Sequence, residues 1–296
     1  MNLAQLRALV AVAETGSITG AGTALQVTQS AVSHALASLE TELDARLVVR
    51  ERSGCVLTEL GYRLLGHARD AVRAVERLAE EAAAARDEHV GRLLIGAFPS
   101  AGQLLPPLVA RLSRHHPGVS VTLLEGSDDE VTEWLRAGIV DLATVTSALP
   151  GLAITPLADD EMLAVVPAGH PLAHEPHVDV EELDGDPFLL SDGGCEPIIQ
   201  AMYAQAGLRL RPTHRVRDMR TLLAMVSENL GVTIAPSLAI SGPSRNQLIH
   251  QGVVGLSLRP RATRTLYLAN RAEVSLSPAA RTLLDAARIE ELRPTG

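Results

Sequence analysis

A chain of 296 residues, 46% of them apolar, is long enough to form two or three domains with separate hydrophobic cores. The formal net charge of −9 and the pI of about 5.6 argue against a protein that binds polyanions over its whole surface, but they leave room for one local nucleic-acid surface. The two cysteines, Cys55 and Cys195, lie far apart, which gives neither a disulfide framework nor a metal-ligand cluster and suits a reducing cytosol.

The N-terminal segment lacks the pattern of an export signal. It is apolar, but it has no basic n-region and contains Arg7 and Glu14, as is typical of an amphipathic helix. Nowhere does the chain approach the ~18 uninterrupted apolar residues of a membrane span. We therefore expect a cytoplasmic protein without a membrane partner.

Three short helices are predicted at the start of the chain. The first ends at Thr15-Gly16, a typical C-terminal stop. Ser17 can cap a second helix over 18–25, which is built of small residues, and Thr28 can begin a third. Three helices of this size, with a tight turn between the second and third, are the plan of a helix-turn-helix unit.

The third helix has an apolar face and a polar face. Val32, Leu36, Leu39 and Leu43 recur at helical spacing and predict packing on a core. In a helix-turn-helix unit the N-terminal residues of this helix meet base edges in the major groove, where Gln can pair with adenine and Ser with several bases. The predicted DNA contacts of this helix are Thr28, Gln29, Ser30, Ser33 and His34.

Residues 45–61 alternate apolar positions around Ser53-Gly54 and predict a two-stranded wing. Arg50 and Arg52 on this wing are expected near phosphates or the minor groove. The alternative is an ordinary helical domain whose Ser and Gln residues face water. Residues 1–60 favour that alternative in one respect, because four arginines against six acidic residues leave a net charge of −2, whereas DNA-binding domains usually carry a basic surface.

A heptad seam follows in residues 61–87, with neither Pro nor a turn cluster before Arg86. Its members are Leu64, Ala68, Ala71, Val75, Leu78 and Ala82. A lone surface helix is the alternative, but a seam of this regularity without a partner would expose apolar area. The pattern predicts a two-fold dimer that presents two recognition helices to a pseudo-palindromic site.

The remaining two thirds alternate strands and helices, which predicts crossover connections, a parallel sheet and two α/β halves. Such sheets bind ligands beyond the carboxyl ends of their strands, where helix N-termini point free amides at the crevice. Small polar residues stand at four such strand ends: Ser100, Ser127, Thr146 and the loop at Gly194-Cys195. They could hold a carboxylate or another small polar ligand, whereas for any single Ser helix capping is the alternative.

Residues 6–61 resemble the winged helix-turn-helix of LysR-type transcriptional regulators in order, spacing and residue type. The matching motifs are GSIT, VTQSAVSHALASLE, the L-x-x-R of Leu47 to Arg50, and LTELG. His34 stands where Arg is more usual, and Ser53 fills a wing position that is often basic. Both departures reduce the phosphate-contacting charge, so affinity should depend more on helix-end amides and on pairing several DNA-binding heads. Further landmarks are GHPLA at 169–173 and NLGVTIAPS at 229–237.

The resemblance implies a multidomain fold. Residues 1–60 would be an all-α winged helix-turn-helix domain and 61–87 a linker helix that pairs protomers. Residues 88–296 would be a two-lobed α/β effector domain similar to periplasmic binding proteins, with lobe 1 at 91–161 and 264–296 and lobe 2 at 162–263. The positions where the family holds its effector are Ser100, Gln103, Ser127, Thr146, Gly194 and Cys195.

The function that follows is promoter binding modulated by a small-molecule effector, such as a carboxylate. The expected partners are double-stranded DNA, a second copy in a homodimer, a homotetramer built from dimers, and RNA polymerase. Phosphate-binding, dinucleotide and zinc motifs are absent from the sequence, so we expect no enzyme activity, cofactor or metal. Asp128, Asp129 and Glu130 are interpreted as partners of a helix N-terminal dipole.

LLSDGGCEPII also looks like the loop that carries the peroxide-sensing cysteine in the oxidative-stress branch of this family. A thiol at a helix N-terminus can have a lowered pKa and react as thiolate. That branch uses a second cysteine shortly downstream, and this chain has none between Cys195 and Gly296. The alternative function is therefore a sulfenic-acid or mixed-disulfide sensor that uses Cys195 without a disulfide inside the domain.

Overall fold

The computed structural model describes residues 1–51, 54–86, 90–240 and 252–291, the side chains of 289–291 excepted. The chain divides into two compact units, Met1–Gly91 with Arg136–Val140, and Arg92–Leu135 with Asp141–Gly296. Each unit has hydrophobic cores of its own.

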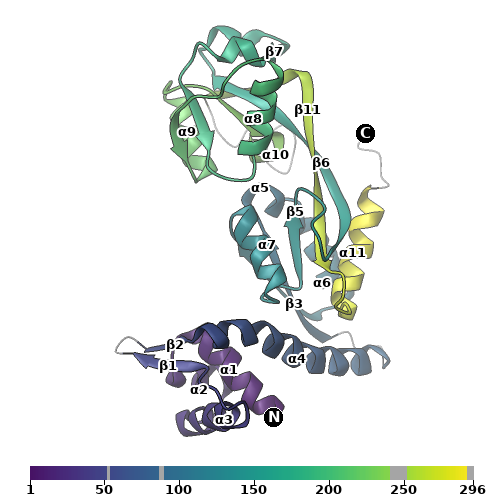
Figure 1. The fold of residues 1–296 in the computed structure, drawn as a ribbon. Coiled ribbons are helices and arrows are strands. Elements are labelled where there is room, and N and C mark those ends of the chain that lie inside the picture. Colours follow the sequence, from purple (N-terminus) through teal and green to yellow (C-terminus); the bar gives the residue numbers. More distant parts are fainter. Residues whose placement is uncertain (52–53, 87–89, 241–251, 292–296) are drawn as a thin grey trace. The chain divides into compact units, whose positions relative to one another are not determined.

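The first unit is a winged helix-turn-helix followed by a long helix (Figure 1). Its elements are α1 (Leu3–Thr15), α2 (Ile18–Leu25), α3 (Gln29–Glu42), β1 (Val48–Glu51), β2 (Gly54–Leu57) and α4 (Glu59–Ala84). Strands β1 and β2 pair in antiparallel fashion and form the predicted wing. The three-helix plan and the hairpin are thus confirmed.

Local capping explains the helix boundaries. Gly16 ends α1 in the left-handed region, with φ of 66°. The Ser17 hydroxyl accepts a hydrogen bond of 2.9 Å from the Gly20 amide, and the Thr28 hydroxyl accepts one of 3.2 Å from the Ala31 amide. The predicted caps of α2 and α3 are confirmed, since each satisfies an amide that the helix itself leaves unpaired.

The apolar stripe of α3 packs on the core as predicted for three of its four members. Val32, Leu36 and Leu39 are buried with residues of α1, α2 and the wing. Leu43 is 39% exposed, so its predicted burial is wrong. The physical reason is that α3 ends at Glu42, and Leu43, as the C-cap, no longer follows the stripe.

Helix α4 starts earlier than the predicted 61–87 because the Thr58 hydroxyl caps it by accepting from the Gly61 amide at 2.9 Å. Its predicted seam divides into two halves. Ala68 is buried in the core of the same unit and Leu64 packs partly against it. Further along, Val75 is 45% exposed and Leu78 is 71% exposed. Only the second half of the seam is therefore an open apolar surface in a single chain.

The second unit alternates strands with helices, drawn from teal to yellow in Figure 1. Its first part contains β3 (Val90–Ala97), α5 (Pro99–Gly102), α6 (Leu105–His115), β4 (Gly118–Glu125), α7 (Asp128–Arg136) and β5 (Leu142–Val145). Next come β6 (Leu152–Pro167), η1 (Pro171–His174), β7 (His177–Asp179), η2 (Val180–Leu183), β8 (Phe188–Ser191) and α8 (Glu196–Gln205). The last elements are β9 (Pro212–Val216), α9 (Met219–Ser227), β10 (Thr233–Pro236), α10 (Ser237–Ile240), β11 (Val253–Arg271) and α11 (Pro278–Glu291).

The main sheet is mixed, and the expectation of a parallel sheet is correct for only some pairs. Strands run in the order β10-β6-β11-β5-β3-β4, with β7 also paired to β11. In this sheet β3 pairs with β5 and β7 with β11 in parallel, whereas the pairs β10 with β6, β6 with β11 and β11 with β5 are antiparallel. A separate two-stranded sheet pairs β8 with β9 in parallel. The long strands β6 and β11 pair along most of their length and run through both lobes (Figure 1). The predicted lobe boundaries, 161/162 and 263/264, lie inside these two strands.

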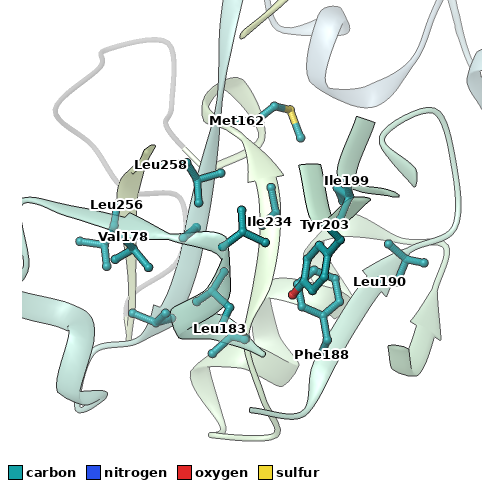
Figure 2. Packing of buried hydrophobic residues seen from close by; sticks show 14 of the residues in the cluster. Met162, Val178, Leu183, Phe188, Leu190, Ile199, Tyr203, Ile234, Leu256 and Leu258 are labelled. Carbon is teal, nitrogen blue, oxygen red and sulfur yellow. The ribbon is translucent and has the colours of Figure 1, made fainter. Parts of the chain in front are cut away.

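Each lobe packs a separate core. In lobe 1 the core lies between β3, α6, β5 and α11. In lobe 2 it includes Met162, Val178, Phe188, Ile199 and Ile234, as Figure 2 shows. The Tyr203 ring meets the Phe188 ring edge-on, with centroids 5.5 Å apart. The two lobes are joined by the paired strands, by polar contacts and by a small apolar cluster in which Leu238 of lobe 2 packs against Phe98 and Ala101 of lobe 1.

Candidate functional site

The polar face of α3 lies beside the wing. Gln29, Ser30 and His34 are exposed, and the Thr28 hydroxyl, besides capping the helix, lies 2.9 Å from the Ser30 hydroxyl. Ser33 is half-buried and accepts a hydrogen bond of 2.7 Å from the Arg50 guanidinium. Arg50 of β1 and the predicted residues of α3 therefore form one contiguous polar surface.

The wing is held in place by the C-terminal half of α3. The Glu40 carboxylate accepts from the backbone amides of Leu47 at 2.8 Å and Val48 at 3.1 Å, and it also binds Arg46 at 3.4 Å. Arg46 is thus neutralised. Arg50 has no carboxylate partner among the described residues, so its charge is available to a polyanion. Arg52, the other predicted wing contact, lies outside the described residues.

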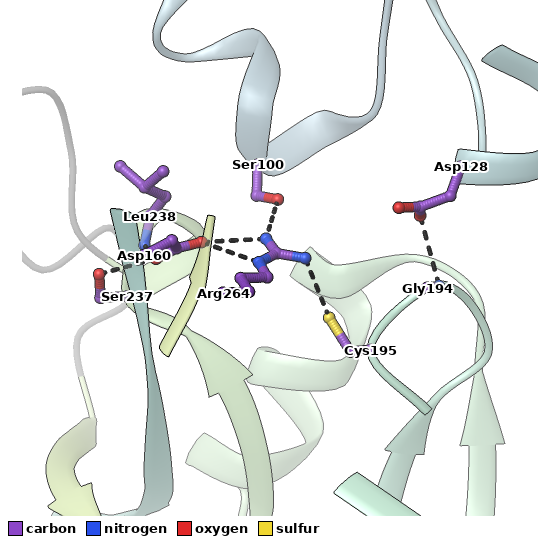
Figure 3. Close-up of polar contacts among 8 residues, drawn as sticks. All are labelled: Ser100, Asp128, Asp160, Gly194, Cys195, Ser237, Leu238 and Arg264. Atoms are coloured by element: carbon purple, nitrogen blue, oxygen red, sulfur yellow. Dashed lines mark hydrogen bonds and ion pairs between the residues drawn. The ribbon is translucent and has the colours of Figure 1, made fainter. Parts of the chain in front are cut away.

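A buried arginine on β11 connects the two lobes (Figure 3). The Arg264 guanidinium binds the Asp160 carboxylate of β6 through Nε at 3.2 Å and Nη2 at 3.0 Å. Nη2 also donates to the Ser100 hydroxyl of lobe 1 at 2.7 Å, and Nη1 contacts Cys195 Sγ of lobe 2 at 3.5 Å. The side chains of Arg264 and Asp160 are 4% and 0% exposed, so this is a fully desolvated ion pair.

The remaining groups around this ion pair satisfy its other hydrogen-bonding positions. Asp160 Oδ1 accepts from the Ser237 hydroxyl at 2.9 Å and the Leu238 amide at 3.1 Å. The Arg264 guanidinium carbon lies 5.5 Å from the centroid of the Phe98 ring. The Phe98 amide in turn donates to the Thr144 hydroxyl at 3.2 Å, which fixes the turn that carries Ser100.

Cys195 is the N-cap residue of α8 and is only 7% exposed. Burial raises the pKa of its thiol; the carboxylates of Asp128 and Asp160 act in the same direction, and the positive charge of Arg264 opposes them. The helix N-terminus therefore does not by itself make this thiol acidic.

An open cavity of about 600 Å³ lies between the lobes. Its walls are the first turn of α7 with Ser127, the 192–194 loop, the first turns of α8, and Arg217. Two contacts cross it: the Gly194 amide donates to Asp128 Oδ2 at 3.3 Å, and the Arg217 guanidinium donates to Glu130 at 2.8 Å. Figure 3 shows the Asp128 carboxylate directed at the Gly194 loop.

The predicted effector residues divide among these features. Ser100 and Cys195 both bind Arg264, and Ser127 and Gly194 line the cavity. Ser127 also caps α7, since its hydroxyl accepts from the Glu130 amide at 3.3 Å. Gln103 and Thr146 belong neither to the lining of that cavity nor to the Arg264 contacts.

Sequence reasoning missed Arg264 and Asp160, which are 104 positions apart. It interpreted Asp128 only as a dipole partner of α7, a role that its place in the first turn supports. Charged residues inside two otherwise apolar segments were the available signal, and it could be used only once both segments were recognised as paired strands.

The part of the chain that the structure describes holds neither a candidate metal centre nor a single membrane-spanning helix. Among the described residues, no group of three or more His, Cys, Asp or Glu side chains could hold a metal ion. Within the same ranges no single helix is long and apolar enough to cross a membrane. Helices α1 and α2 together have the length and composition of a membrane span, but the two are bent by 118° relative to each other.

A winged helix-turn-helix followed by a two-lobed α/β domain with a cavity between its lobes defines a class of DNA-binding proteins that carry a ligand-binding domain. Residues 3–62 match the bacterial regulatory helix-turn-helix family of the LysR type, and residues 86–290 match the LysR substrate binding domain. The chain therefore belongs to the LysR family of transcriptional regulators.

Known proteins similar to the chain include regulators of different description. The uncharacterized transcriptional regulator YvbU of Bacillus subtilis is 33% identical over 97% of this chain and 98% of its own. A probable hydrogen peroxide-inducible genes activator of Mycobacterium avium is 34% identical over 80% of this chain and 78% of its own. A full-length OxyR variant of Pseudomonas aeruginosa has the same fold, with a TM-score of 0.78 and 24% identity over 98% of each chain.

Proposed function

We propose that this chain is a promoter-binding regulator whose DNA binding responds to a small molecule held between the lobes of the second unit. The observation that carries the proposal is the cavity of about 600 Å³, which both lobes line. Its volume lies within the roughly 300–1,000 Å³ of typical small-molecule sites. Members of the family are regulators and not enzymes, and the site is interpreted as a binding site.

Promoter sequence would be read by α3 together with the wing. Gln29, Ser30, Ser33 and His34 are proposed to meet base edges, with Thr28 at the helix start. Arg50 and Arg52 are proposed to contact phosphates or the minor groove. Because its DNA-contacting surface carries little positive charge, a single winged helix-turn-helix domain (one DNA-binding head) should bind DNA weakly. It should gain affinity from a second head bound to the same DNA.

A homodimer would supply that second head. The exposed Val75 and Leu78 of α4 support pairing of two copies along this helix, with a tetramer built from two dimers. The complex would act in the cytoplasm and contact RNA polymerase at the promoter.

The effector would act through the relative arrangement of the lobes. Contacts that join them at the cavity and its floor include Cys195 with Arg264, Asp128 with Gly194, and Glu130 with Arg217. A ligand shifts the population of arrangements only if it binds them with different affinity. Ligand binding that changes these contacts would alter the spacing of the heads and hence DNA bending and polymerase contact.

DNA binding can be tested on the intergenic DNA beside the chain's own gene. We expect this duplex to bind more tightly than a random duplex of equal length throughout a salt series, and both affinities to fall with salt as counterions are released. Equal affinities at every salt concentration would refute sequence-specific binding. Gln29→Ala should reduce the difference in affinity between the two duplexes, whereas Gln205→Ala, at an exposed position of α8 outside the cavity lining, should leave it unchanged.

A thiol-based sensor is the second candidate, favoured by the Arg264 contact at 3.5 Å from Cys195 Sγ and by the similarity to a peroxide-inducible activator. In this reaction the Cys195 thiolate attacks one peroxide oxygen, the O–O bond breaks, and the other oxygen leaves as water after taking a proton; the sulfur is oxidised to sulfenic acid. A thiol reductant would restore the thiol.

Peroxide should then change DNA binding in the parent and in Cys55→Ser but not in Cys195→Ser. A peroxide response that survives in Cys195→Ser would exclude this residue as the sensor. If Cys195→Ser instead changes effector affinity, the residue belongs to the ligand site.

A further inference from the structure

The cavity between the lobes is lined mainly by acidic side chains. Its acidic residues are Asp128, Asp129, Glu130, Asp192 and Glu196, and among the described residues Arg217 is the one basic residue in the lining. Three of the acids already have an arginine partner. Glu130 binds Arg217 at 2.8 Å, Glu196 binds Arg215 outside the lining at 2.8 and 2.9 Å, and Asp192 lies 3.9 Å from the same Arg215. Asp128 and Asp129 have no cationic partner within hydrogen-bond distance among the described residues.

Several of the hydrogen-bond donors that an anion would need are already in use. At the start of α7 the Ser127 amide donates to Glu130 at 2.8 Å, and the Glu130 amide donates to the Ser127 hydroxyl at 3.3 Å. The Gly194 amide donates to Asp128, and the Glu196 amide donates to the Gly193 carbonyl. A carboxylate ligand would therefore meet occupied amides and unpaired negative charges.

A hydrogen-bond acceptor in the same place is unsatisfied. Asp128 Oδ2 accepts from Gly194, but Asp128 Oδ1 is buried and has no hydrogen-bond partner. An unpaired buried carboxylate oxygen is costly, and burial raises the pKa of this carboxyl group, while the positive charge of Arg264 acts in the opposite direction. A cationic group beside this carboxylate would offset that cost and stabilise its charged form.

We propose that the effector of this cavity is a small organic cation whose ammonium, amidinium or guanidinium group binds the carboxylate of Asp128. This inference rests on the proposed effector site and specifies its ligand class. Asp129, which is exposed at the same helix start, provides a second acceptor at the mouth of the cavity. The carboxylate effector expected from strand-end hydroxyls and amides is the less favourable ligand here, because four of those amides are occupied and the lining is mainly acidic.

The test uses the full chain and four probes of one skeleton, benzylamine, benzamidine, benzyl alcohol and benzoate, with binding measured by calorimetry and thermal shift. We expect the two cations to bind more tightly than the alcohol, and benzoate to bind least. Asp128→Asn should weaken cation binding by about tenfold or more, because a charged partner is replaced by a neutral one of equal size. Asp285→Asn removes the same charge from an exposed site on α11 and should change nothing.

Asp129→Asn provides a second variant at the cavity if Asp128→Asn does not fold, and should also weaken the cations. The proposal is overturned if benzoate binds as well as the amines, if no cation binds, or if cation binding is unchanged in both cavity variants. The salt-series DNA assay, run without any probe, tests the proposed sequence-specific DNA binding independently of the ligand class. Specific DNA binding that persists while the cations fail would reject only the ligand class.

Discussion

The ion pair between Arg264 and Asp160 should be the most sensitive point of the second unit. In Arg264→Ala the Asp160 carboxylate, 0% exposed, would keep only the Ser237 and Leu238 donors and would lose its counter-charge. Breaking a buried pair by removing one partner costs about 3–5 kcal/mol. This is a large fraction of the roughly 5–15 kcal/mol by which a folded domain is stable.

The expected loss is measured by thermal and urea unfolding of the full chain. For a unit of this size about 1 kcal/mol corresponds to roughly 2–4 °C in Tm, so Arg264→Ala should lower the transition of the second unit by about 10 °C. The matched control is Arg288→Ala, which removes an arginine 62% exposed and paired with Asp285 at 3.5 Å. That pair should contribute about 0.3–0.5 kcal/mol.

Two further variants separate charge from geometry. Arg264→Lys keeps the positive charge but loses the planar fork that reaches Asp160, Ser100 and Cys195 together, so its stability should lie between the parent and Arg264→Ala. The double variant Asp160→Ala with Arg264→Ala should lose less than the sum of the two single losses, because no buried charge is left alone. A loss in Arg264→Ala no larger than that in Arg288→Ala would refute the reasoning.

Three other predictions concern DNA, the thiol and assembly. Arg50→Ala should weaken binding to specific and random duplexes alike and reduce the salt slope by about one per head, measured by a salt titration of DNA affinity. Asp128→Asn should lower the pKa of Cys195 by removing a nearby negative charge, so the pH profile of Cys195 alkylation should move to lower pH, and a shift to higher pH would contradict it. Leu78→Glu, at a side chain 71% exposed, should shift the chain from dimer toward monomer in analytical ultracentrifugation without lowering the stability of the monomer.

The elements of the first unit were predictable because their causes are local. A cap needs only a hydroxyl and an amide three residues on, as at Ser17 and Thr28. The spacing of apolar residues does not indicate where a helix ends, and for this reason the burial predicted for Leu43, which lies just after the end of α3, was wrong. Likewise the heptad pattern of α4 did not reveal that Ala68 serves the core of its own unit.

The second unit was predictable as alternating strands and helices but not as a mixed sheet. Strand direction depends on which segments meet, and β6 and β11 pair across about a hundred intervening residues, as Asp160 and Arg264 illustrate. Periodicity within a segment carries no information about its partner. The expectation of a parallel sheet therefore held for β3 with β5 and failed for the two longest strands.

The sequence by itself determined the order of the elements, the helix-turn-helix motif and the family to which the chain belongs, because these depend on residue type and local spacing. Tertiary structure alone decided how the polar groups of the second unit combine. It joined Ser100, Cys195 and Asp160 through Arg264, and it directed Asp128 to Gly194 across the cavity. The physical reason is that charge pairing and desolvation depend on distances in space, and those distances exist only after the paired strands bring the two lobes together.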